Sequence, residues 1–267
     1  MKQRKAIRDR FVNKVAIVTG GSAGIGLATV EELCKEGCAV AFTGIEEDLG
    51  AEVLARLQRA GFDVIFCHGD MADEQFCKDV VKRTMEKWGL VHYLVNNAFA
   101  FIFRGLDATR ADFERMFQVG PFAYVTMAQS VVESMKKAGG GGIVNVSSVS
   151  AFVAQPNRWT YNSAKGAVDT LTKCMAMDLV PYNIRVNSVS PGWIWTRAEE
   201  NAAGADKAKW AKIWGRYHMM GRCGEPVEVA AAILFLLSDD AAFITATDLG
   251  VDGGYMGMGG EGFGWRE

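Results

Sequence analysis

Thr19-Gly20-Gly21-Ser22-Ala23-Gly24-Ile25-Gly26 is the stretch that decides the fold. It follows a β-branched run, Val15–Thr19, and leads into an amphipathic segment predicted as a helix over Gly26–Glu36. Glycines let the backbone turn tightly and approach a pyrophosphate, whose charge is held by the free N–H groups and the dipole of the helix. A tight strand-to-helix turn without a ligand is the alternative, but the position after the first strand favours phosphate binding.

Outward from this turn, short β-branched runs alternate with longer amphipathic runs along the chain, a pattern typical of βαβ units around a parallel sheet. The predicted strands are Val15–Thr19, Ala39–Thr43, Asp63–His68, Tyr93–Asn96, Gly142–Ser147, Arg185–Ser190 and Thr247–Val251. The predicted helices include Gly26–Glu36, Leu49–Ala60, Glu74–Trp88, Phe113–Lys137, Tyr161–Val180 and Pro226–Leu237. We therefore expect an α/β fold: a Rossmann-type doubly wound parallel sheet of about seven strands with helices on both faces.

No Pro/Ser-rich linker and no internal repeat interrupts this alternation of strands and helices, which argues against a second domain. A single domain over residues 1–267 is expected. Residues 1–12 form an N-terminal extension and residues 255–267 a glycine-rich C-terminal tail. Residues 197–221, the most irregular internal stretch, are expected to cover the carboxyl ends of the strands as a substrate-loop lid.

The composition is that of an ordinary globular protein, with 49% hydrophobic residues, 22% charged residues and a formal net charge of -2. No broad attraction to nucleic acid or to a membrane is implied, and no apolar run is long enough to span a bilayer. The cysteines form no Cys-x-x-Cys pair and no histidine stands at zinc-ligand spacing, so reduced thiols and no metal site are expected. Met1–Arg10 is basic but lacks the features of a secretory signal, so we expect a cytoplasmic protein, with organelle import as the alternative.

Further motifs follow the glycine turn in a fixed order. They are Asp70 after the third strand, Asn96-Asn97-Ala98 after the fourth, and Pro191-Gly192 with Thr196 after the sixth. With these motifs the chain resembles the classical short-chain dehydrogenase/reductase family from Lys14 to about Gly254. The resemblance implies that Asp70 lies beside the adenine and that the Pro191 segment meets the nicotinamide carboxamide. The cofactor-binding residues it implies are Gly20, Ser22, Ala23, Gly24, Ile25, Gly26, Gly44, Ile45, Asp70, Met71, Asn97, Ala98, Tyr161, Lys165, Pro191, Gly192, Ile194 and Thr196.

Tyr161 and Lys165 are four residues apart and therefore project from the same face of a helix. The pair alone is common by chance, but the family's pattern is Tyr-x-x-x-Lys with a serine thirteen residues before the tyrosine, which is Ser148 here. Tyrosine has an ordinary pKa near 10, and an adjacent ammonium together with an oxidised nicotinamide favours the phenolate. Ser148 is expected to position the substrate oxygen, Tyr161 to exchange the proton, and Lys165 to tune Tyr161 and bind the nicotinamide ribose. Ser147 and Ser150 are interpreted as structural.

The implied activity is NAD(P)-dependent hydride transfer that interconverts a secondary alcohol and a ketone, or a sugar hydroxyl and a lactone. The alternative from another class is a nucleotide-binding sensor or scaffold with weakened catalysis, against which Ser148, Tyr161 and Lys165 together argue. A sugar-nucleotide epimerase or dehydratase also uses Tyr-x-x-x-Lys, but the glycine spacing and the lack of a C-terminal substrate domain count against it.

The sequence departs from the family's pattern in three places. Val119-Gly120-Pro121 stands where relatives carry an asparagine that helps to hold a proton-relay water, so we expect an impaired or rerouted relay. Phe99 replaces the glycine that follows Asn-Asn-Ala and is expected to narrow the cofactor pocket or to shape the substrate entrance. His92 replaces an aspartate and is interpreted as a structural histidine with a backbone partner.

The end of the second strand distinguishes NAD from NADP, because an acidic residue there binds the ribose hydroxyls and a basic residue binds the extra phosphate. Here it reads Gly44-Ile45, followed by Glu46-Glu47-Asp48, and Ala23 stands where NADP-dependent relatives often carry a basic residue. Carboxylates repel a phosphate dianion, so NAD is expected, with NADP possible. The alternative is that these acids only favour the dipole of a helix start.

Aromatic residues gather in segments expected to converge over the nicotinamide, which fits a small-molecule alcohol or carbonyl substrate with an apolar or ring face. About half are expected to serve core or lid packing instead. They are Phe99, Phe101, Phe103, Phe152, Trp159, Trp193, Trp195, Trp210, Trp214 and Tyr217. The family resemblance also implies a homotetramer or homodimer built through the long helices predicted at Phe113–Lys137 and Tyr161–Val180.

Overall fold

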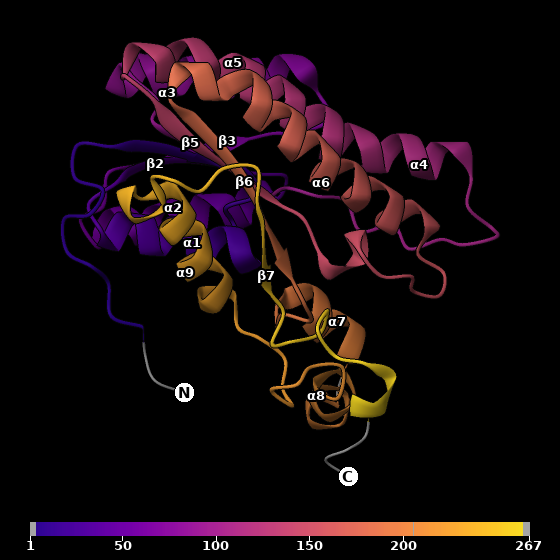
Figure 1. The fold of residues 1–267 in the computed structure, drawn as a ribbon. Helices are drawn as coiled ribbons and strands as arrows, with labels where there is room; N and C mark the ends of the chain where they lie inside the picture. The colour runs from indigo at the N-terminus through magenta and orange to yellow at the C-terminus, as the bar shows by residue number, and fades with distance from the viewer. Residues whose placement is uncertain (1–3, 205, 264–267) are drawn as a thin grey trace.

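The structure is a computed structural model that describes residues 4–204 and 206–263. Within these residues the strands form a 7-stranded parallel sheet in the order β3-β2-β1-β4-β5-β6-β7. Figure 1 shows the sheet between two layers of helices. The strands are β1 (Val15–Val18), β2 (Ala39–Gly44), β3 (Val64–His68), β4 (Tyr93–Asn96), β5 (Gly141–Val146), β6 (Ile184–Pro191) and β7 (Asp248–Val251). Each predicted strand is confirmed to within one residue at either end, and the predicted fold class is confirmed.

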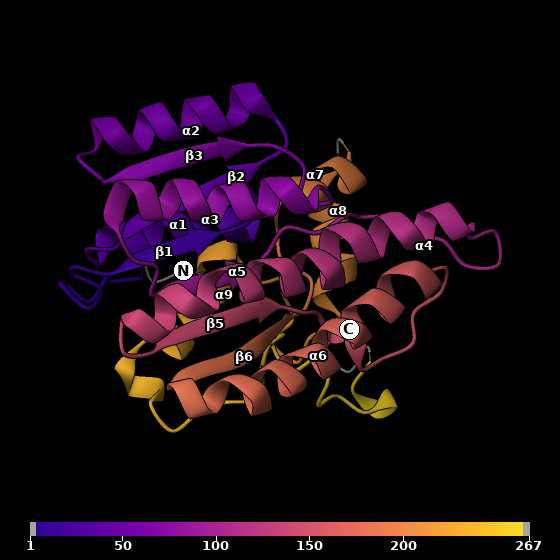
Figure 2. The ribbon, with the colours of Figure 1, turned by 90° about the horizontal axis from the view of Figure 1, so that it is seen from above.

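Helices cover both faces of the sheet. One layer holds α1 (Gly24–Lys35), α2 (Glu47–Arg59) and α9 (Pro226–Leu237); the other holds α3 (Glu74–Trp88), α5 (Ala123–Lys137) and α6 (Trp159–Leu179). Figure 2 shows this second layer from above, with α3 and α5 side by side and α6 beyond them, packed on β6. Helices α3 and α9 match their predicted bounds, and α1, α2 and α6 begin two residues earlier than predicted.

Two apolar cores separate the sheet from its helices, and β1 supplies side chains to both. Ala16 and Val18 enter the core beneath α1 and α9, while Ile17 enters the core beneath α3 and α5. Successive side chains of a strand point to opposite faces, so a strand covered on both sides reads as a continuous apolar run. Ile17 is 0% exposed, and full burial of such a side chain contributes about 1.5–3 kcal/mol.

The direction of the connections reverses between β1 and β4, because β1 pairs with β2 on one side and with β4 on the other. Strands added before and after this point extend the sheet in opposite directions. A crevice opens at the carboxyl ends of the strands wherever an open α/β sheet reverses in this way. The loop after β1, which holds the glycine turn, is therefore placed at that crevice.

The predicted helix Phe113–Lys137 is wrong as a single element. The structure divides it into α4 (Arg110–Phe117), a π-helical turn η1 (Gln118–Phe122) and α5. Gly120 has non-helical backbone angles, and Pro121 lacks the N–H that a continuous helix requires. The hydrophobic periodicity continues across this break, which is why the sequence pattern alone conceals it.

The expectation of an irregular stretch at 197–221 is also wrong in part. It contains α7 (Arg197–Ala203) and α8 (Lys207–Gly215), although residue 205 lies outside the described residues. Helix α7 begins with a capping box in which Thr196 and Glu199 satisfy each other's backbone N–H groups. Figure 1 shows α7 and α8 beyond the carboxyl end of β6, where the lid was expected.

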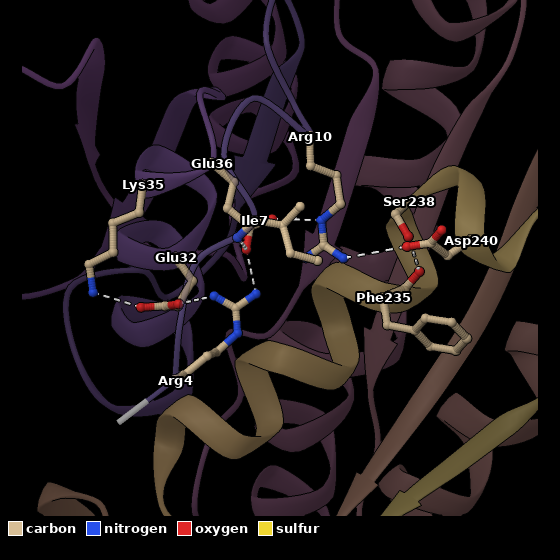
Figure 3. Close-up of polar contacts among 9 residues, drawn as sticks. All are labelled: Arg4, Ile7, Arg10, Glu32, Lys35, Glu36, Phe235, Ser238 and Asp240. Atoms are coloured by element: carbon tan, nitrogen blue, oxygen red, sulfur yellow. Dashed lines mark hydrogen bonds and ion pairs between the residues drawn. The ribbon is translucent and has the colours of Figure 1, made fainter. Parts of the chain in front are cut away.

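The N-terminal extension is fastened to the last turn of α1 by ion pairs (Figure 3). Glu36, whose side chain is 0% exposed, accepts hydrogen bonds from Arg10 Nε at 2.6 Å and from the Ile7 backbone N–H at 3.1 Å. Arg4 pairs with both Glu32 and Glu36. A carboxylate at the C-terminus of a helix opposes the helix dipole, so these cations offset an otherwise unfavourable buried charge. The sequence expectations for residues 1–3 and 264–267 lie outside the described residues.

Candidate active site

The glycine turn has the shape that a pyrophosphate requires. Gly20 and Gly24 adopt left-handed φ angles of 65° and 56°. A Cβ at Gly26 would lie 2.1 Å from the Gly20 carbonyl oxygen, so only glycine allows the helix to start so close to the strand. The Asn97 amide holds the turn by donating to the carbonyl oxygens of Thr19 at 2.9 Å and Gly20 at 3.2 Å. The residues present therefore fit a dinucleotide.

A crevice of about 370 Å³ runs from this turn along the carboxyl ends of the strands. Its volume lies within the ordinary range for small-molecule sites. The predicted cofactor-binding residues that line it are Gly20, Ser22, Ala23, Gly24, Ile25, Gly44, Ile45, Asp70, Met71, Asn97, Ala98 and Thr196. These residues follow different strands, and the parallel sheet brings them to one edge.

The remaining predicted cofactor residues do not line this crevice. Gly26 lies beneath the turn, against the Gly20 carbonyl. Ile194 lines a separate cavity behind the end of β6, and Gly192 lines the cavity that contains Tyr161. Pro191 is buried, and so is Lys165, which lines neither the crevice nor the Tyr161 cavity.

Two arginines line the crevice without having been predicted from the sequence. Arg115 on α4 pairs with Asp70 at 2.8 Å, and this contact lowers the pKa of Asp70 against the opposing effect of partial burial. Arg197 at the start of α7 pairs with Glu46 at 3.2 Å across the mouth of the crevice. Nothing in the sequence indicates that Arg115 lies near Asp70. Arg197 could have been found, because it directly follows Thr196, which was predicted to bind the cofactor.

A second cavity, of about 340 Å³, contains the predicted catalytic serine and tyrosine. Ser148 follows β5, and its Oγ accepts a hydrogen bond from the Ser150 N–H at 3.1 Å. Aromatic rings form much of the wall: Phe101 stacks on Tyr161 with centroids 6.0 Å apart, and Phe103 meets it edge-on at 5.2 Å. Phe101 and Ala198 line this cavity and the crevice alike, so the two spaces are adjacent.

Tyr161 and Lys165 lie one turn apart on α6, with the Lys165 Nζ 5.6 Å from the centroid of the Tyr161 ring. Lys165 is buried and donates from Nζ to the Val146 carbonyl oxygen at 2.8 Å. Burial lowers the pKa of Lys165 well below its usual value. Burial also raises the pKa of Tyr161 to about 12, although a hydrogen bond with Ser148 and the charge of Arg158 oppose the shift. For the protein groups alone, desolvation outweighs the nearby charges, so the acidic phenol expected from the sequence stays a prediction for the complex with an oxidised nicotinamide.

Phe99 and Gly120, which were treated as separate departures from the family, form one contact. A Cβ at Gly120 would lie 2.4 Å from Cε2 of Phe99, so the ring occupies the space that a side chain at position 120 would fill. The same ring faces the Lys165 ammonium, with Nζ 3.5 Å from the ring centroid. A buried ammonium gains about 2 kcal/mol from such a cation–π contact. Phe99 therefore shields Lys165 from the crevice.

The residues interpreted as structural have structural partners. His92 Nδ1 accepts a hydrogen bond from the Val15 N–H at 3.1 Å, which confirms the expected backbone partner. Ser147 Oγ donates to the Lys165 carbonyl oxygen at 3.4 Å, and Ser150 Oγ donates to Gln155 Oε1 at 2.6 Å. Within residues 4–204 and 206–263, no group of three or more His, Cys, Asp or Glu side chains could hold a metal ion. In that same part of the chain, no helix has the length and apolar character that crossing a bilayer would demand.

A reversing parallel sheet, a glycine turn at its switch point and an adjacent cavity with a buried tyrosine define a dinucleotide-dependent oxidoreductase. Comparison with known proteins agrees. The family model described as enoyl-(acyl carrier protein) reductase matches residues 20–256. The chain belongs to the short-chain dehydrogenase/reductase family, and it is an NAD(P)-dependent oxidoreductase of the class that acts on CH–OH groups.

Characterised relatives align along nearly their whole length. A cyclopentanol dehydrogenase of Comamonas sp. is 36% identical over 247 residues, which are 92% of this chain and 98% of that protein. An NADP-dependent (R)-specific alcohol dehydrogenase of Lentilactobacillus kefiri is 35% identical, with 92% and 98% covered. A solved 7α-hydroxysteroid dehydrogenase, in complex with NADH and 7-oxo glycochenodeoxycholic acid, superposes with a TM-score of 0.86 at 32% identity and covers 92% of this chain and 95% of its own.

Proposed function

We propose that this enzyme interconverts a secondary alcohol and a ketone with NAD, and that Ser148, Tyr161 and Lys165 are its catalytic residues. One observation carries the proposal. The cavity that holds Ser148 and Tyr161 shares Phe101 and Ala198 with the crevice beneath the glycine turn. A substrate oxygen beside Tyr161 is then next to the space that a nicotinamide would enter, which proximity catalysis requires.

Each catalytic residue has a distinct task. Ser148 Oγ accepts the Ser150 N–H and is hydrogen-bonded to Tyr161, so its hydroxyl lies beside the phenol, where it can position the substrate oxygen. Tyr161 gives its phenolic proton to that oxygen during ketone reduction and takes it back during alcohol oxidation. Lys165, held by the Val146 carbonyl oxygen with Nζ 5.6 Å from the centroid of the Tyr161 ring, favours the phenolate when it is protonated. When bound, the nicotinamide supplies the hydride acceptor or donor and, if oxidised, a further positive charge.

The raised pKa of Tyr161 bears on the direction of the reaction. A phenol with a pKa of about 12 remains protonated at neutral pH and serves ketone reduction directly as an acid. Alcohol oxidation requires the phenolate, so the positive charges of Lys165 and an oxidised nicotinamide must together overcome the desolvation. The route by which a proton would reach Lys165 differs from that of relatives, because Gly120 lacks the side-chain amide of their asparagine and the Phe99 ring covers the Lys165 ammonium.

NAD is proposed as the physiological cofactor on electrostatic grounds. Glu46 lies directly after Ile45, which lines the crevice, and Arg197 on the opposite side is paired with Glu46 at 3.2 Å. Arg115 is likewise paired with Asp70 at 2.8 Å. An extra ribose phosphate would therefore meet cations that already have carboxylate partners.

The test of the function is the Tyr161→Phe variant. The reduced-cofactor absorbance is followed with wild type and variant across cyclic, acyclic and steroid alcohols and ketones, with each cofactor. We expect a loss of at least about 10²-fold in kcat, because general acid–base catalysis contributes that much, while NAD binding stays within about twofold. A near-normal rate would show that another group moves the proton. Cofactor binding without turnover of any substrate would favour a sensor or scaffold instead.

A homodimer or homotetramer in the cytoplasm completes the proposal. Large apolar side chains on the second helix layer are exposed, including Phe122 at 59% and Met177 at 75%. Large exposed apolar side chains on one layer of the fold are what an interface between protein chains would cover. The cysteines of the described chain are free thiols, as in a reducing compartment. Light scattering during size-exclusion chromatography reports the assembly, and a monomer at micromolar concentration would contradict it.

A further inference from the structure

Arg158 lies in the wall of the Tyr161 cavity, at the residue that precedes α6. Its guanidinium carbon is 4.2 Å from the centroid of the Phe103 ring, 5.4 Å from that of Trp193 and 5.9 Å from that of Tyr161. These rings hold the cation at a defined place. It is close to the catalytic phenol yet on the side of the cavity formed by Phe103 and Trp193.

The guanidinium has no hydrogen-bond acceptor among residues 4–204 and 206–263. Among the described residues, no hydrogen bond or ion pair involves the Arg158 side chain, although it carries five N–H donors. Burial lowers its pKa, which reflects the cost of removing this charge from water. Cation–π contacts satisfy the charge in part but leave the donors unused. The guanidinium therefore presents N–H donors to the cavity without an acceptor among the described residues, which is the arrangement that suits an anion.

The neighbouring polar groups fit the same ligand. Gln155 lines the cavity, and its Oε1 accepts from Ser150 Oγ at 2.6 Å, which leaves the Nε2 donors free of any described partner. Glu199, the acid in this cavity, is engaged through Oε2 with the backbone and hydroxyl of Thr196, and it forms no ion pair with Arg158. The donors of Arg158 and Gln155 are therefore available together.

We propose that the natural substrate is an anionic alcohol or ketone: an apolar or ring body that carries a carboxylate, which Arg158 binds while the reacting oxygen meets Ser148 and Tyr161. The proposal rests on the proposed function and adds the substrate's charge to it. The aromatic walls accept the body, since Trp193 stacks on Trp214 at 4.8 Å and both line the cavity. Guanidinium and carboxylate pair through two parallel hydrogen bonds, which also fixes the orientation of the substrate.

The kinetic test compares two substrates that differ only in charge, 3-hydroxycyclohexanecarboxylate and 3-hydroxycyclohexanecarboxamide. We expect wild type to prefer the carboxylate in kcat/KM by about tenfold or more, and Arg158→Gln to bring the carboxylate-to-carboxamide ratio of kcat/KM close to one, whatever its effect on the two separate rates. Arg158→Lys, which keeps the charge, should retain part of the preference. Arg104→Gln is the matched control, because that arginine is exposed and pairs with Asp107 outside the cavity.

A binding test separates failure of this inference from failure of the proposed function. Cyclohexanecarboxylate and cyclohexanecarboxamide are titrated against tryptophan fluorescence, with Trp193→Phe as the check that the signal comes from the cavity. Tighter binding of the carboxylate by about tenfold, lost in Arg158→Gln, supports the receptor even if neither alcohol is turned over. Equal affinities would overturn the inference and indicate that Glu199 neutralises Arg158 in solution. A preference that survives in Arg158→Gln would also overturn it, because another group would then bind the carboxylate.

Discussion

Restoring the asparagine found in relatives at position 120 is expected to destabilise this protein. In Gly120→Asn the new Cβ would lie 2.4 Å from Cε2 and 2.8 Å from Cζ of Phe99. The ring cannot move aside easily, because it packs edge-on against Tyr161 at 5.7 Å and Tyr124 at 6.3 Å and lies 3.5 Å from the Lys165 ammonium. Overpacking of this kind costs about 1–3 kcal/mol.

A double-mutant cycle tests whether the contact is the cause. Phe99→Ala alone should cost roughly 2 kcal/mol, below the range for a fully buried phenylalanine, because this ring is half-buried. The double variant removes the clash, so its loss in the free energy of unfolding should be smaller than the sum of the single losses by about 1–2 kcal/mol.

Urea unfolding of the cofactor-free protein measures each free energy. Gly260→Asn is the control for the substitution itself, because a Cβ there meets nothing within 4 Å, and it should change stability by less than about 0.5 kcal/mol. Additivity of the two single changes within about 0.5 kcal/mol would refute the reasoning and show that Phe99 and Gly120 are independent.

Three further predictions concern charge. Glu36→Gln should destabilise the protein by roughly 2–4 kcal/mol, because Arg4 and Arg10 lose a carboxylate that is 0% exposed. Glu31→Gln is the control, because it breaks a surface pair with Arg56 and should cost less than about 1 kcal/mol. Equal shifts in melting temperature for the two variants would contradict the prediction for Glu36. Ile45 lines the crevice just after β2, and Ile45→Asp should raise the NAD/NADP ratio of kcat/KM. This variant is preferred to Gly44→Asp, because a Cβ at Gly44 would lie 2.6 Å from Ser22 Oγ. An unchanged ratio would place ribose recognition elsewhere. Burial raises the pKa of Tyr161 to about 12 in the folded chain, so the unfolded chain loses this proton first as the pH rises. The contribution of Tyr161 to stability is therefore intact below pH 10 and declines between about pH 10 and 12. The melting-temperature difference between wild type and Tyr161→Phe should follow that course, and a difference that does not change with pH would show that the phenol is not desolvated.

Most of the fold could be predicted because its determinants are local. The β-branched runs at Val15–Val18 and Tyr93–Asn96 are short, apolar and flanked by turn residues, so their boundaries are sharp. The helix through position 120 was mispredicted for the opposite reason. Its apolar periodicity continues through Gly120-Pro121, and only the backbone geometry reveals the π-helical turn. Helices α7 and α8 were missed because they are short and depend on caps at Thr196 and Asp206.

The candidate site divides in the same way. Twelve predicted cofactor residues line the crevice because each follows a strand, and parallel strands end at one edge. Arg115 and Arg158 were not predicted, since each reaches its cavity from an element whose neighbours are distant in sequence. Lys165 is predicted to bind the cofactor, and only the structure shows that its ammonium contacts the Val146 carbonyl oxygen and the Phe99 ring.

The sequence by itself determined the order of strands and helices, the glycine turn and the spacing of Ser148, Tyr161 and Lys165. These features depend on periodicity and backbone freedom, which act over a few residues. Tertiary structure alone decided that Phe99 fills the space beside Gly120, that Tyr161 is desolvated enough to raise its pKa, and that Arg158 faces the cavity without an acceptor. Burial and contact between distant segments set those properties, because desolvation and steric exclusion depend on everything that surrounds a group.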